Sequence, residues 1–128
     1  MKAEWEQAAH RGDVDQIKRL IREGADINAR DRYAQTALMI AARNGRTSLV
    51  GFLVDQGAEL NHTAKCHLTA LMLAVINDHI DIVRTLVRAG ANLEIQGTGP
   101  PGFHAKTAMD LAKVQGQPDL IDALRPSG

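Results

Sequence analysis

Histidine and cysteine side chains are the residue types in this chain that could bind a metal ion, and several lie close together. His62, Cys66 and His67 share one short stretch, and His79 follows soon after it. Imidazole and thiolate groups are the ligands that zinc prefers. However, their spacing matches no common zinc pattern, and Cys66 has no second cysteine to accompany it. The sequence therefore predicts no metal site.

Nucleophilic catalysis and phosphate binding are two further kinds of chemistry for which the chain has candidate residues. Cys66 stands beside His67, and a thiol nucleophile needs a neighbouring base. Adjacent residues of an extended segment point apart, and no oxyanion hole is evident near them. Gly97, Gly99 and Gly102 lie in a proline-containing loop, not between a strand and a helix as in a phosphate-binding loop. We therefore expect no catalytic residue, no cofactor and no enzyme activity.

Arginine and tyrosine side chains provide a third kind of chemistry, that of binding. Arg11, Arg30, Arg32 and Arg43 occur in the first third of the chain together with Tyr33. Tyrosine and arginine are enriched among the residues that dominate protein interfaces. Arginines also contact phosphates, so an alternative function is that of a nucleic-acid-binding accessory protein.

Overall charge favours a protein partner over nucleic acid. Fifteen basic and fifteen acidic residues cancel, whereas nucleic-acid-binding domains usually carry a clear basic excess. Asp110, Asp119 and Asp122 would also repel a long polyanion near the C-terminal end. We expect the partner to be another protein, with an acidic segment that meets the arginines.

The elements that must position these residues recur with a fixed period. The segment 24–28 returns at 57–61 and at 90–94, 33 residues apart each time, and 36–42 returns at 69–75. A period of this length is typical of a solenoid, in which each unit buries its apolar face against its neighbours. The sequence predicts a single domain over residues 1–128 with four units, at roughly 3–30, 31–63, 64–96 and 97–125.

The second unit illustrates the expected local structure. Thr36 precedes the apolar run 37–42, which has helical periodicity, and its hydroxyl group is expected to cap that helix. Gly45 ends the helix because glycine accepts a left-handed φ. A second helix is expected from Ser48, and residues 31–35 belong to an extended hairpin finger between units.

This pattern resembles the ankyrin repeat. The family's helical hairpin carries the signature Thr-Pro-Leu-His-x-Ala-Ala, then Gly-His, then Gly-Ala-Asp-x-Asn, and the recurring segments follow it from about residue 3 to about residue 125. The resemblance implies an all-α solenoid of helix-turn-helix units joined by hairpin fingers, with a capping unit at each end. It also implies protein binding through the finger tips and the exposed side of the first helices.

The chain departs from the family pattern at a few positions. Met39 and Met72 replace the family's histidine, which predicts adaptable apolar packing instead of hydrogen bonds. Ala34 and His67 replace the turn glycine of the fingers. Asp78 stands where glycine ends the other first helices, and aspartate tolerates the left-handed region better than most residues.

Aligning the units identifies the finger-tip and first-helix positions that the repeat leaves free, and these are the predicted partner-binding residues. Tyr33 and the surrounding arginines are the expected anchor, whereas Leu68, Ile76 and Val114 are expected to form an exposed apolar part in the later units. The predicted partner-binding residues are Arg11, Arg30, Arg32, Tyr33, Gln35, Arg43, Asn44, Lys65, Cys66, Leu68, Ile76, Asn77 and Phe103.

The fourth finger is longer than the others. Ten residues, 97–106, separate Gln96 from Thr107, and insertions in repeat proteins often lie on the binding side. Phe103 either presents its ring near the tip of this finger or folds back over the last unit.

The composition of the chain indicates how its core packs and where the protein is located. Hydrophobic residues make up 45% of the chain but aromatic residues only 3%, which suits closely packed small helices. A single cysteine favours a reducing compartment. The chain has no run of 18 apolar residues and no apolar run at its start. We therefore expect a cytoplasmic monomer that acts as an adaptor or a steric inhibitor.

Overall fold

The structure, a computed structural model, describes residues 2–125 and consists of short α-helices and connecting loops. Between residues 2 and 125 it contains no β-strand. No helix of this part of the chain is long and apolar enough to cross a membrane. The elements are α1 (Ala3–Arg11), α2 (Val14–Arg22), α3 (Ala37–Asn44), α4 (Thr47–Asp55), the 3-10 turn η1 (Lys65–His67), α5 (Ala70–Ile76), α6 (Ile80–Arg88), α7 (Ala108–Gln115) and α8 (Pro118–Leu124).

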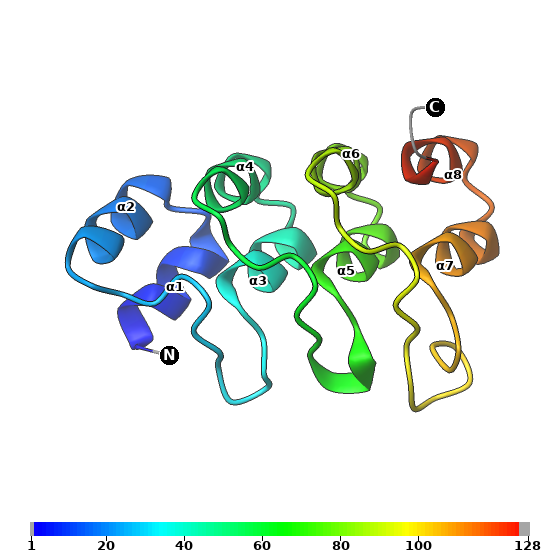
Figure 1. Cartoon of the computed structure of the whole chain (residues 1–128), viewed down its shortest axis with the longest axis horizontal. Helices are drawn as coiled ribbons and strands as arrows, with labels where there is room; N and C mark the ends of the chain where they lie inside the picture. The colour runs from blue at the N-terminus through cyan, green and yellow to red at the C-terminus, as the bar shows by residue number, and fades with distance from the viewer. Residues whose placement is uncertain (1, 126–128) are drawn as a thin grey trace.

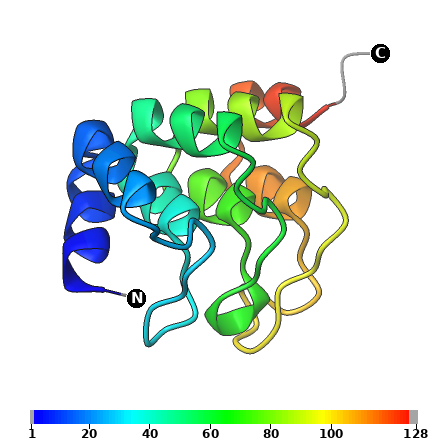
Figure 2. The same cartoon turned by 60° about the vertical axis from the view of Figure 1, so that its left-hand side comes forward.

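The helices form two parallel layers. Figure 1 shows α1, α3, α5 and α7 in one row and α2, α4, α6 and α8 in a second row above it. Within each row a helix packs against the next one, and each unit's two helices pack against each other. The loops at 31–35, 64–68 and 97–106 project beyond the first row on one side (Figures 1 and 2). This arrangement confirms the predicted all-α solenoid with fingers.

Each predicted unit holds one helix pair, and the division at residues 30, 63 and 96 stays a prediction. The first helices of the later three units begin at equivalent threonines. Thr36, Thr69 and Thr107 accept hydrogen bonds from the backbone N–H three residues further on, at 3.4, 3.2 and 3.2 Å. These bonds satisfy amides that have no partner within the helix. The predicted cap at Thr36 is therefore confirmed, and Thr69 and Thr107 form the same cap.

The first helices also end as the sequence indicated. Gly12, Gly45 and Gly116 take left-handed backbone angles directly after α1, α3 and α7. Asp78 adopts a φ of 60° at the equivalent point after α5. A left-handed residue therefore ends every first helix, even where glycine is absent.

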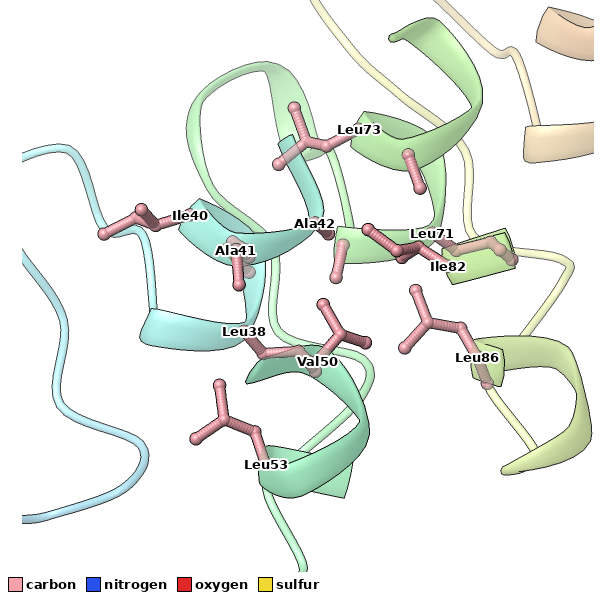
Figure 3. Packing of buried hydrophobic residues seen from close by; sticks show 14 of the residues in the cluster. Leu38, Ile40, Ala41, Ala42, Val50, Leu53, Leu71, Leu73, Ile82 and Leu86 are labelled. Carbon is pink, nitrogen blue, oxygen red and sulfur yellow. The ribbon is translucent and has the colours of Figure 1, made fainter. Parts of the chain in front are cut away.

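The core is a continuous apolar layer between the two rows of helices. Leu38 and Leu71 of the first row pack with Val50, Leu53 and Leu86 of the second, and Figure 3 shows these side chains pointing toward one another. The Met39 and Met72 side chains are fully buried as well, which confirms their predicted apolar role. Small residues at Ala41, Ala42 and Ala74 are completely buried and let the helices approach closely.

Helix α7, the first helix of the fourth unit, carries an additional cap. Thr107 N donates to Asp110 Oδ2 at 3.0 Å while Asp110 N donates to Thr107 Oγ1. This reciprocal arrangement is a capping box. The backbone hydrogen bond from Thr107 lowers the pKa of Asp110 below its ordinary value, because it stabilises the charged carboxylate.

Candidate functional site

A groove lies between the second finger (31–35) and the third finger (64–68), and it is bounded by the adjoining helices α3 and α5. Its volume is about 330 Å³. Six of the predicted partner-binding residues line it, and Ala64 and Leu73 complete the lining. Those six are Tyr33, Gln35, Arg43, Lys65, Cys66 and Leu68.

The second finger is shaped by the carboxylate of Asp31. Asp31 Oδ1 accepts hydrogen bonds from the backbone N–H groups of Tyr33 at 2.8 Å and Gln35 at 2.9 Å. Asp31 N donates to the carbonyl oxygen of Gln35, which closes the hairpin. Ala34 takes a φ of 63°, so it fills the predicted place of the turn glycine. The turn holds its backbone without help from a partner.

Tyr33 is the exposed aromatic residue of this finger. Its side chain is 57% exposed, although it lines the groove. The Arg32 guanidinium lies 5.5 Å from the centre of the Tyr33 ring, which places a cation over an aromatic face. The two side chains therefore present one amphipathic surface at the finger tip.

The third finger is a hairpin turn that is hydrogen-bonded to the fourth finger. Ala64 N donates to the carbonyl oxygen of Leu68 and closes the hairpin, and Cys66 and His67 both have positive φ, at 62° and 59°. Thr98 N donates to the carbonyl oxygen of Cys66 at 2.7 Å. His67 Nδ1 donates to the carbonyl oxygen of Gln96 at 2.9 Å. These two bonds fix the third finger against the fourth.

Two of the predicted surface residues are buried, which corrects the expectation that they are exposed. Gln35 is 8% exposed and Leu68 is 9% exposed. Both precede a capping threonine, a position from which the side chain turns toward the first turn of the following helix. Leu68 and Leu73 stand at the two positions of a hydrophobic staple and line the same groove. The position of Leu73, four residues after the capping Thr69, was the sequence signal that could have predicted the burial of Leu68.

The apolar residues expected on the later units divide into two groups. Ile76 is half-buried and packs against the core, so the expectation that it forms part of an exposed apolar surface is wrong for most of its side chain. Val114 is 75% exposed, as expected. Within residues 2–125, Leu68, Ile76 and Val114 therefore do not form one exposed apolar surface.

Some predicted polar residues are engaged within the fold. Asn44 Nδ2 lies 3.2 Å from His10 Nδ1, which connects the first two units. Asn77, which directly follows α5, donates from Nδ2 to the carbonyl oxygen of Leu73 in that helix at 2.8 Å. Both side chains remain exposed beside these contacts, but their polar groups have structural partners.

The four predicted arginines do not act as one patch. Arg30 contacts His62 Nδ1, and His62 Nε2 lies 2.7 Å from Glu59 Oε2. Arg11 is exposed at the end of α1 and is not one of the residues that line the groove. Arg43 lines the groove and Arg32 stands beside it on Tyr33. Two of the four arginines, Arg32 and Arg43, therefore lie at the groove.

Phe103 is half-buried and packs against the core cluster, so of its two expected placements the folded-back one holds. The fourth finger closes through Gly97 N, which donates to the carbonyl oxygen of Lys106, and Ala105 N, which donates to that of Gly97. A Cβ atom at Gly97 would lie 2.5 Å from the Phe103 carbonyl oxygen. The close approach of these two loop segments requires glycine at position 97.

The histidines considered as metal ligands point to different contacts. His62 meets Arg30 and Glu59, and His67 bonds to the backbone of the fourth finger. His79 Nε2 donates to the carbonyl oxygen of Arg43 at 3.0 Å. Across residues 2–125, no three histidine, cysteine or acidic side chains are grouped so that they could hold a metal ion.

Comparison with known proteins agrees with this architecture. A family model described as ankyrin repeats, in three copies, matches residues 5–97. The chain belongs to the ankyrin repeat family. Ankyrin repeats generally mediate protein–protein interaction, and proteins built from them are typically binding modules without enzyme activity.

Two individual proteins are similar to a short segment of the chain. The chain is 50% identical over 44 residues to a mitochondrial disaggregase of Bos taurus and 46% identical over 44 residues to that of Homo sapiens. Each match covers 34% of this chain and 6% of the relative. The chain therefore matches only a small part of the length of these relatives.

Proposed function

We propose that this chain binds a partner protein through its finger tips and the concave face of its first helices, and that it acts as an adaptor or a steric inhibitor without catalysis of its own. The observation that carries the proposal is the groove between the second and third fingers. Six of the residues that line the groove are ones that the repeat pattern does not specify, and among them the exposed Tyr33 stands at its edge. Docking there would mask the partner's contacted surface or link it to another protein.

The experiment that tests this function is affinity capture from a lysate of the source cells. Wild type is compared with the variant Tyr33→Ala/Arg32→Ala/Arg43→Ala, and bound proteins are identified by mass spectrometry. We expect a protein captured by wild type to be lost from the variant, because exposed tyrosine and arginine at an interface contribute strongly to affinity. Capture that is equal for both would remove the finger surface from the binding function.

A matched control keeps the number of substitutions constant on another face. The variant Arg22→Ala/Arg84→Ala/Arg88→Ala changes exposed residues of α2 and α6, in the second row of helices. It should capture the same proteins as wild type. Thermal unfolding followed by circular dichroism should show that both triple variants remain folded.

Nucleic-acid binding is the alternative function, and it rests on the same arginines. In this structure Arg30 contacts His62 rather than joining the groove, which weakens the case for a continuous basic patch. The capture experiment at two salt concentrations separates the two functions, because phosphate-driven binding falls steeply with salt. Recovery of nucleic acid that disappears at high salt would favour the alternative.

Location and assembly are proposed from composition. We propose a cytoplasmic monomer, supported by the single cysteine of the chain and by the general rarity of disulfides in reducing compartments. Cell fractionation and analytical ultracentrifugation test the two statements. Recovery in an organelle fraction or as a stable dimer would contradict them.

A further inference from the structure

We propose that the groove between the second and third fingers binds a short extended segment of the partner, in which an acidic side chain lies within about two residues of an apolar one. This inference rests on the protein-binding function proposed above and names the chemistry of the segment that is bound. Charge, apolar lining, an unpaired amide and a rigid frame support it.

The charge of the groove is uniformly positive. Arg43 and Lys65 line it, both are exposed, and no aspartate or glutamate lines it with them. Neither cation forms an ion pair with any residue between 2 and 125. Oδ1 of the nearby Asp31 accepts hydrogen bonds from two backbone N–H groups, and Arg32 adds a further cation on Tyr33. Charge complementarity therefore selects an acidic side chain.

The remaining lining is apolar and suits a side chain of similar character. Ala64, Leu68 and Leu73 line the groove, and the Tyr33 ring adds an aromatic surface at its edge. Its volume of about 330 Å³ lies near the lower end of the roughly 300–1,000 Å³ typical of ligand pockets. A groove of this size holds one apolar side chain and a short stretch of peptide rather than the surface of a folded domain.

A buried amide indicates that the ligand has free backbone groups. Gln35 lines the groove, and its Oε1 atom is buried without a hydrogen-bond partner among residues 2–125. A buried acceptor without a donor is costly. An extended peptide carries unpaired backbone N–H and C=O groups, and the Gln35 amide can meet either kind by turning about its Cγ–Cδ bond. A helical ligand offers no such groups along its length.

The walls of the groove are held in place before any ligand arrives. Asp31 fixes the second finger through its two hydrogen bonds. The fourth finger fixes the third through the bonds from Thr98 N to Cys66 and from His67 to Gln96. A site that is already ordered loses less conformational freedom on binding, which favours a short ligand with few contacts.

The test uses a phage library that displays random ten-residue peptides, selected on the full chain. We expect the selected sequences to combine aspartate or glutamate with a neighbouring leucine, isoleucine or aromatic residue. The most frequent peptide is then synthesised with a fluorophore and measured by fluorescence anisotropy. Its affinity should fall at least about tenfold for Arg43→Gln/Lys65→Gln, since two charged contacts are lost.

Two further measurements assign the binding to the groove. The control variant Arg22→Gln/Arg88→Gln removes the same charge from α2 and α6 and should bind the peptide like wild type. Cys66, the single cysteine of the chain, lines the groove, so bound peptide should slow its alkylation by iodoacetamide. Unfolding curves should show that both variants keep the fold.

Each outcome decides the proposal. Selection of acidic and apolar peptides that protect Cys66 and need Arg43 and Lys65 supports it. Basic or purely apolar peptides, unchanged binding by Arg43→Gln/Lys65→Gln, or no selected peptide would overturn it. Protein capture that still depends on Tyr33, Arg32 and Arg43 would then leave the general binding function standing. Salt-sensitive capture of nucleic acid alone would remove both.

Discussion

The side-chain oxygen of Asn61 accepts a hydrogen bond of 2.8 Å from the backbone N–H of Asn92, 31 residues further along the chain. The same bond occurs one period earlier, where Asn28 Oδ1 accepts from Glu59 N at 3.0 Å. The asparagine at the end of each Gly-Ala-x-x-Asn segment therefore fixes the loop that follows in the next unit. Because units in a solenoid contact only their neighbours, such bonds contribute directly to the coupling between units.

We predict that Asn61→Ala lowers the free energy of unfolding by about 1 kcal/mol, the typical net contribution of one hydrogen bond. Asn61→Asp keeps the accepting oxygen and should retain most of the stability. Urea unfolding followed by circular dichroism measures both. Equal losses in the two variants would show that the bond to Asn92 is not the cause.

Truncation of core leucines should destabilise the chain strongly. Leu38→Ala, Leu71→Ala and Leu86→Ala each remove a side chain that is at most 1% exposed, and each should cost about 2–5 kcal/mol. Val114→Ala is the control, because that side chain is 75% exposed and its loss should stay within about 0.5 kcal/mol. Chemical denaturation tests the set, and normal unfolding of the leucine variants would contradict the packing.

The capping box of α7 predicts a specific pH dependence. The hydrogen bond from Thr107 N lowers the folded-state pKa of Asp110 below its ordinary value of 3.8. The stability from this group is therefore present above pH 3.8 and is lost as the pH falls through the folded-state pKa. Asp110→Asn cannot titrate, so it should lose less stability than wild type between about pH 5 and pH 2. Urea unfolding at several pH values measures the difference, and parallel pH profiles would contradict it.

Gly97 and Gly102 form a matched pair in the fourth finger. A Cβ atom at Gly97 would lie 2.5 Å from the Phe103 carbonyl oxygen, whereas one at Gly102 would meet nothing within 4 Å. We expect Gly97→Ala to cost about 1–3 kcal/mol because the hairpin must open to relieve the overlap. Gly102→Ala should have little effect. Calorimetry measures the melting temperatures of the two variants. Similar melting temperatures would contradict the close contact between Gly97 and the Phe103 carbonyl oxygen.

The finger turn at Ala34 is a candidate for stabilisation. Its φ of 63° is unfavourable for a residue with a Cβ atom by about 1–2 kcal/mol, whereas glycine costs the unfolded chain about 0.5–1 kcal/mol in entropy. Ala34→Gly should therefore stabilise the fold slightly, by up to about 1 kcal/mol. Ala89→Gly is the control, because Ala89 has a φ of −76° and should only lose stability. Thermal unfolding compares them, and a loss at both positions would contradict the strain at Ala34.

Local signals in the sequence were sufficient to predict the elements that repeat. Thr36, Thr69 and the glycines after the first helices mark helix ends through interactions within a few residues, so local chemistry is enough to place them. The apolar runs identified the core, including Leu38 and Leu71, because each unit buries its face only against its neighbours. The family and the solenoid follow from these local signals.

The way in which the fingers contact one another could not be predicted from these local signals. The hydrogen bond from Thr98 N to the carbonyl oxygen of Cys66 joins segments of two different units, and the half-burial of Phe103 follows from its packing against the core cluster. The groove between the second and third fingers is also formed by residues of two different units. Repeat periodicity records which residues are alike, but it does not record the turn angles and cross-unit hydrogen bonds that set the distance between fingers.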